Sequence, residues 1–170
     1  MPYPDLSRVT PFYHRYIRLV EEEDILEAFH WHSPDFIGFL LAIPADKHDF
    51  RYAEDKWSIK EVVQHLVDAE RVFSYRAMCF ARGDKQVLPG FDENEYAKTS
   101  RGDARNWEAL LNEFMALRNA TEYLFQSFDA SQLDAGGISE GNLSNYTLAL
   151  GYVILGHCRH HKNIITERYL

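Results

Sequence analysis

The chain has 170 residues, 46% of them hydrophobic and 14% aromatic, with a formal net charge of −8 at pH 7. This length and hydrophobic content exclude a disordered chain and predict a single folded domain over residues 1–170. The acidic balance argues against nucleic acid as a partner, because phosphate contacts need clustered Lys and Arg. No apolar run approaches the roughly 18 residues of a membrane span, and no signal peptide is visible, so we expect a cytoplasmic protein without a membrane partner.

The first helical pattern begins near Glu22, after residues 1–20, which show no clean period and are expected to form a lead-in segment. Apolar side chains then recur at intervals of three and four residues up to Leu41. Pro34 interrupts this pattern, so the helix should kink there or restart with Ser33 as its cap. Pro44 is expected to end it.

The second helix has the best-marked start in the chain. Ser58 is followed three residues later by Glu61, the spacing of a capping box, and Trp57 and Val62 are placed for a hydrophobic staple. Its apolar stripe continues toward the segment Arg82-Gly83-Asp84, which should stop the helix.

A long connection over residues 83–105 follows, and loops of this length inside a domain are often functional. Within it, Phe91 and Tyr96 are expected at the rim of a pocket. A third helix begins at Trp107 and fades near Phe128.

A second connection over residues 129–143 contains three glycines, after which Asn142 or Ser144 should cap the fourth helix, which runs to the C-terminus. Four amphipathic helices without alternating apolar residues predict an all-α fold, a four-helix bundle with long connecting loops. The wide connections allow a helix order other than simple up-and-down. Both cysteines, Cys79 and Cys158, are expected to be buried free thiols.

The fourth helix holds three of the eight histidines within five residues. His157 and His161 are four apart, so they stack on one helical face among apolar residues, where their nitrogen lone pairs need a partner. His65 lies in the apolar stripe of the second helix. We predict a divalent metal site of His65, His157 and His161 with open coordination positions, although a histidine on an apolar face is often a satisfied core residue. His160 faces elsewhere and would be solvated or would support a ligand.

The remaining polar candidates give no confident catalytic residue. Three charged residues follow His65 on its helix and either orient the ligands, bind an anionic substrate or form the solvated side: Asp68, Glu70 and Arg76. Four other histidines are expected at the surface: His14, His30, His32 and His48. A di-iron carboxylate bundle is excluded because it requires two Glu-x-x-His motifs, and only Glu27–His30 is present.

Two segments resemble the DinB/YfiT-like superfamily: residues 56–71, KWSIKEVVQHLVDAER, and residues 156–161, GHCRHH, followed by IITERYL at 164–170. The resemblance implies a four-helix bundle with a three-histidine metal triad, mapped onto His65, His157 and His161. It also implies a zinc or nickel ion, a homodimer and, in characterised relatives, a low-molecular-weight thiol such as bacillithiol or mycothiol as cosubstrate.

Two functions follow as hypotheses. The first is a metal-dependent enzyme that acts on a small-molecule substrate, as a thiol S-transferase or a hydrolase, with the metal lowering the pKa of a bound thiol or water. The alternative is a non-catalytic, metal-stabilised bundle that acts in dimerisation or partner binding.

Overall fold

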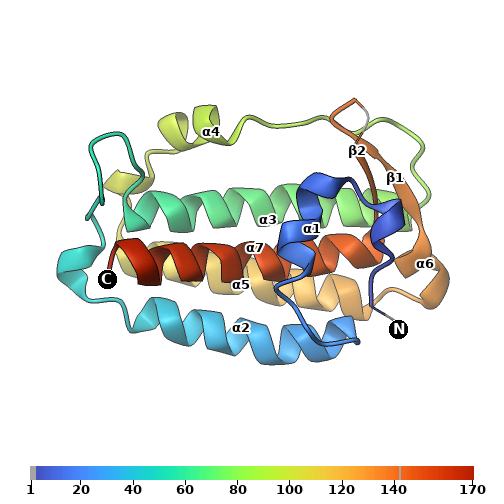
Figure 1. Ribbon diagram of the computed structural model, residues 1–170, viewed down its shortest axis with the longest axis horizontal. Helices are drawn as coiled ribbons and strands as arrows, with labels where there is room; N and C mark the ends of the chain where they lie inside the picture. The colour runs from blue at the N-terminus through green and yellow to red at the C-terminus, as the bar shows by residue number, and fades with distance from the viewer. Residues whose placement is uncertain (1–2, 142) are drawn as a thin grey trace.

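A computed structural model describes residues 3–141 and 143–170, and four long helices form its core (Figure 1). These are α2 (Ile25–Leu41), α3 (Ile59–Ala81), α5 (Trp107–Gln126) and α7 (Thr147–Arg168). Both α2 and α3 pack against α5 and α7, so α2 lies diagonally opposite α3, and α5 lies diagonally opposite α7. Helices α3 and α5 run one way and α2 and α7 the other (Figure 1). The predicted four-helix bundle is confirmed, and its helix order departs from simple up-and-down, as the wide connections allow.

Shorter elements cover one side and one end of this bundle (Figure 1). Helix α1 (Pro11–Ile17) packs on α7, α4 (Glu93–Ser100) packs on α3, and α6 (Ala130–Asp134) contacts both. Strands β1 (Gly136–Ser139) and β2 (Leu143–Tyr146) pair antiparallel, with Gly136 opposite Tyr146. Three 3₁₀ turns complete the described elements: Leu6–Arg8, Ala45–Lys47 and Gly102–Ala104.

Polar caps start three of the four long helices. Ser58 accepts a hydrogen bond from the Glu61 amide while the Glu61 carboxylate accepts one from the Ser58 amide, which confirms the predicted capping box of α3. Asp24 caps α2 and Asn106 caps α5 through side-chain oxygens that accept hydrogen bonds from backbone amides of the first turn. Helix α3 ends at Ala81, and Gly83 follows with a φ of +77°, as the glycine stop predicts.

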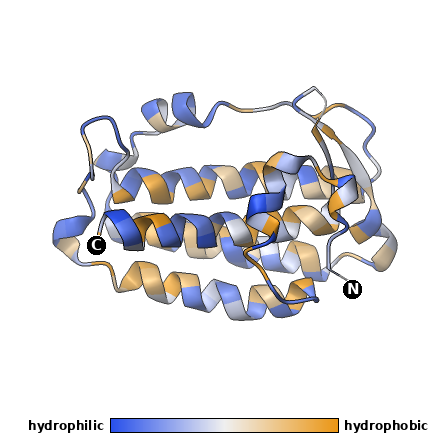
Figure 2. Cartoon of the chain, in the orientation of Figure 1, coloured by the Kyte–Doolittle hydropathy of each residue, from blue (hydrophilic) through white to orange (hydrophobic). Residues whose placement is uncertain are grey.

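The core consists of two apolar clusters stacked along the bundle. One gathers α1 and the first half of α7, and the other gathers the first half of α3, α5 and Ile165 of α7. Every residue of α7 from Thr147 to Cys158 is buried, so this helix is the centre of the molecule. By contrast α4 is mostly hydrophilic and mostly exposed (Figure 2). No helix in the described part of the chain has the length and apolar character needed to span a membrane.

Several predicted boundaries are wrong. The lead-in segment contains α1, whose seven residues are too short to show a helical period. Helix α2 passes through Pro34 without restarting, so Ser33 is no cap, and it ends at Leu41 before Pro44.

The connections are also more ordered than expected. Residues 83–105 hold α4, and residues 129–143 hold α6 and β1. Ser144 lies in β2 and does not cap α7, whose N-cap residue is Tyr146, while Asn142 lies outside the described residues. Cys79 and Cys158 are buried free thiols, as predicted.

Candidate metal centre

Three histidine side chains from two helices converge where α3 crosses α7. The Nε2 atom of His157 lies 3.1 Å from Nε2 of His65 and 3.1 Å from Nε2 of His161. The three candidate ligand nitrogens all lie within 4.8 Å of one another. His65 and His157 are buried and His161 is half-buried. The structure therefore brings together all three residues that the sequence predicted as ligands.

The spacing of these nitrogens fits a metal ion better than it fits hydrogen bonds. A ring Nε2 carries either one proton or one lone pair, directed along a single line in the ring plane, so His157 can make a hydrogen bond to only one neighbour. For an ion about 2.0–2.1 Å from each nitrogen, adjacent ligands are separated by about 3.3 Å in tetrahedral and about 3.0 Å in octahedral geometry. The two separations from the His157 nitrogen, 3.1 Å each, fall between these values.

The protonation state also suits a metal site. Burial lowers the pKa of His65 to about 4, with a smaller contribution from His160. Burial first, and then the neighbouring histidines and Arg15, hold the pKa values of His157 and His161 well below the ordinary 6.5. All three rings are therefore neutral at pH 7, which is the form that binds a metal.

Aromatic side chains fix the orientation of these rings. The Trp57 ring centroid lies 4.9 Å from that of His65, and Tyr16 lies 5.1 Å from His157. Among the described residues, Nδ1 of His161 is buried without a hydrogen-bond partner. A metal-ligating histidine usually donates this second N–H to an acceptor, and the described residues offer His161 none.

Gly156 allows helix α1 to pack closely on α7 beside the three histidines. A Cβ atom on Gly156 would lie only 1.9 Å from the Tyr16 carbonyl oxygen, so the backbone of α1 touches α7 directly beside His157. Glycine is the residue that allows such a contact, because it has no side chain. The close approach places Tyr16 against the His157 ring and brings α1 into the wall of the cavity that the three histidines line.

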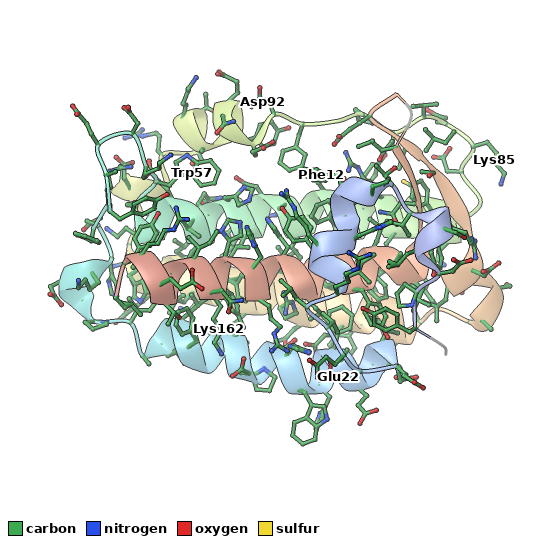
Figure 3. The ribbon with its side chains drawn as sticks, in the orientation of Figure 1. Phe12, Glu22, Trp57, Lys85, Asp92 and Lys162 are labelled. Carbon is green, nitrogen blue, oxygen red and sulfur yellow. The ribbon has the colours of Figure 1, made fainter. Side chains whose placement is uncertain are left out.

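The histidines open into a cavity of about 240 Å³ between α1, α3, α4 and α7. Figure 3 shows two of its aromatic residues, Phe12 and Trp57, on the side of the bundle where α4 lies. Six aromatic side chains line it: Phe12, Tyr13, Tyr16, Trp57, Phe73 and Phe91. Four polar residues join them, namely Arg15, Glu93, Glu140 and His160. A small molecule with an apolar body would fit such a site.

Comparison with known proteins shows the family of this chain and a solved structure with the same fold. The sequence profile of the DinB superfamily matches residues 28–165. The chain belongs to the DinB superfamily. Among solved structures, YfiT from Bacillus subtilis, which is described as a probable metal-dependent hydrolase with an unusual four-helix bundle topology, superposes with a TM-score of 0.70. The match has 16% identity and covers 98% of this chain and 91% of that chain, so the two share a fold. No curated protein matches the chain.

Other predicted residues of this DinB protein have roles that differ from those expected. Glu70 and Arg76 are almost fully buried, so they are not part of a solvated side, and neither contacts the three histidines. Asp68 is half-buried and accepts a hydrogen bond from Gln64. His32 is not at the surface: it is 7% exposed and its Nε2 lies 2.7 Å from a carboxylate oxygen of Glu22.

The polar lining of the cavity was missed or only partly predicted. Arg15 lies on α1, which the sequence did not predict, and Glu140 lies at the hairpin, in a left-handed conformation with a φ of +51°. His160 is half-buried and lines the cavity. Phe91 lines it as expected, whereas Tyr96 contacts Phe91 and lines a neighbouring cavity.

Proposed function

We propose that this protein is a metal-dependent enzyme that hydrolyses a small molecule. The observation that carries the proposal is the convergence of three neutral imidazole nitrogens on a cavity large enough for a small organic substrate. Three histidines without a fourth protein ligand is the arrangement of catalytic rather than structural zinc sites. The fold shared with YfiT, a probable metal-dependent hydrolase, supports the same class of reaction.

His65, His157 and His161 would hold the divalent ion, for which zinc and nickel are the first choices because both accept imidazole ligands. Such an ion lowers the pKa of a water molecule and polarises the bond under attack. The protein itself contributes the neutral state of its ligands, rigid aromatic walls and shielding from bulk water. Tyr16 and Trp57 keep the ligand rings in place through edge and tilted contacts.

Transfer of a thiol to an electrophile is the second candidate reaction. Three neutral ligands leave both charges of a divalent ion unbalanced, which favours an anionic ligand such as the thiolate of a low-molecular-weight cosubstrate. The test is consumption of free thiol in the presence of an electrophile. The homodimer that the family resemblance implies stays a prediction.

The deciding experiment pairs metal analysis with activity. Metal-free protein is incubated with zinc, nickel or manganese, its bound metal is measured by elemental analysis, and hydrolysis of a panel of small esters and amides is followed. We expect about one equivalent of metal per chain, and a His65→Ala variant that is folded but loses at least about tenfold in metal affinity. His30→Ala, which removes an exposed histidine, is the matched control.

The same variants separate catalysis from the non-catalytic alternative. A folded His65→Ala protein without activity, beside an active wild type, supports an enzyme. A variant that unfolds, beside a metal-loaded wild type that turns over none of the substrates, would favour a metal that only holds α3 and α7 together.

A further inference from the structure

The charges around the cavity are unevenly balanced. Two carboxylates line it, Glu93 and Glu140. An oxygen of Glu140 accepts a hydrogen bond of 2.9 Å from the buried guanidinium of Arg76. Glu93 lies in the first turn of α4, at the positive end of the helix dipole. The charge of Glu140 is thus paired with that of Arg76, whereas the helix end offsets the charge of Glu93 only in part.

Arg15 has no such carboxylate partner. Its guanidinium lies over the rings of Phe12 and Tyr16, with its carbon 4.3 and 4.7 Å from their centroids, and its Nη2 donates to the Tyr16 hydroxyl at 2.9 Å. No carboxylate in the described part of the chain lies within ion-pair distance of it. A guanidinium has five N–H donors, and this one uses one of them on a side chain.

The position of Arg15 connects it to the three histidines. The residue lines the same cavity as His157 and His161, and the Tyr16 ring to which it donates lies 5.1 Å from that of His157. It is held there because the α1 backbone contacts α7 at Gly156. A guanidinium stacked on two rings is restricted in its rotamers, so it loses little freedom when it binds an anion.

We propose that the cavity selects substrates with an anionic oxygen group, a carboxylate or a phosphate, attached to an apolar body, and that Arg15 determines this specificity. Arginine matches the two oxygens of such groups through parallel N–H donors. The aromatic side chains provide the contact surface for the apolar body. The inference rests on the proposed function for the location of the substrate, but the contribution of Arg15 can be measured without any metal.

The test compares ligands that differ in charge at nearly constant shape. Phenylacetate, phenyl phosphate and neutral phenylacetamide are titrated into metal-free and metal-loaded protein, and dissociation constants are obtained from NMR shift changes. We expect metal-free wild type to bind phenylacetate about tenfold more tightly than phenylacetamide, the effect of one charge-assisted hydrogen bond. Arg15→Gln should bring this ratio close to one, and Arg15→Lys should restore part of it. Phenyl phosphate shows which of the two anions is preferred.

Arg18→Gln is the matched control, because Arg18 is exposed like Arg15 and follows α1 directly but does not line the cavity. Equal ratios in the wild type and Arg15→Gln, or tighter binding of the amide, would overturn the inference. A protein that binds no metal but keeps an Arg15-dependent anion preference would reject the hydrolase and leave the specificity standing. An active metalloenzyme without that preference would support the hydrolase and reject the proposed role of Arg15 in specificity.

Discussion

At the scale of single residues, Gly156 connects the backbone geometry to the site. Replacement by alanine would force Cβ to within 1.9 Å of the Tyr16 carbonyl oxygen, a backbone atom that cannot turn aside. We expect Gly156→Ala to lower the free energy of unfolding by about 1–3 kcal/mol, or more where α1 is displaced. Urea denaturation measures the change, and metal affinity should fall with it, because α1 carries the contacts to His157.

Gly38→Ala provides the control for this prediction. Gly38 is also inside a long helix, but a Cβ atom there meets nothing within 4 Å. Alanine should therefore stabilise α2 by about 0.5–1 kcal/mol through its helix propensity. If both variants changed stability in the same direction, close packing at Gly156 would not be the cause.

At the scale of elements, one buried ion pair joins the helices of the bundle. Arg118 of α5 donates from Nε and Nη2 to the two oxygens of Glu70 on α3, at 2.9 and 2.7 Å. It also donates to Ser33 of α2 and to the thiol of Cys158 of α7. A single guanidinium thus contacts side chains from all three other helices of the bundle, and one of them, Cys158, is the neighbour in sequence of the proposed ligand His157.

Breaking this pair should be costly. Arg118→Met leaves the Glu70 carboxylate buried without its partner, and we expect a loss of about 3–5 kcal/mol in the free energy of unfolding. The double variant Arg118→Met/Glu70→Leu should recover most of that loss, because a buried ion pair can often be replaced by apolar residues of similar volume. Denaturant titration of the three proteins measures both effects. A double variant no more stable than the single one would show that Arg118 acts through Ser33 and Cys158 instead.

Elements whose residues are specified by local chemistry could be predicted from the sequence, and those specified by distant contacts could not. Helix α3 was identified because its start depends on local chemistry, the reciprocal bonds between Ser58 and Glu61. The triad was identified because helical spacing places His157 and His161 on one face, and His65 lies on an apolar stripe of another helix. Helix α1 was missed because its seven residues are specified by packing on α7 at Gly156, a contact between segments far apart in the chain.

The hairpin and its residue Glu140 were unpredictable for a related reason. Strands of four residues give too little alternation to detect. Glu140 adopts a φ of +51°, and tertiary contacts hold it there: its amide donates to the Leu88 carbonyl, and Arg76 binds its carboxylate. His32 was misassigned to the surface because its partner, Glu22, is ten residues away in the chain.

At the scale of the whole molecule, the buried histidines link stability to pH. His65 has a pKa of about 4 in the folded protein, lowered by burial, against an ordinary value of 6.5. Between these two values the unfolded chain binds more protons than the folded one. The contribution of His65 to the free energy of unfolding is therefore fully present above pH 6.5, and it is lost progressively as the pH falls from 6.5 toward 4. His157 and His161 act in the same direction, because their pKa values are lowered too.

This dependence can be separated from that of the carboxylates. Glu22 and Glu113 also have lowered pKa values, through hydrogen bonds to His32 and to Arg71 and Arg105, but their contribution is lost only below the ordinary value of 4.5. We expect the free energy of unfolding of the metal-free protein to fall between pH 6.5 and 5. His65→Ala should reduce that slope by up to about 1.4 kcal/mol per pH unit, the effect of one proton. Urea titrations at closely spaced pH values measure both slopes. Equal slopes in the two proteins would contradict a neutral, buried His65. Bound metal should leave this slope nearly unchanged between pH 6.5 and 5, because the folded histidines carry almost no protons there, and should steepen it only as the pH approaches 4.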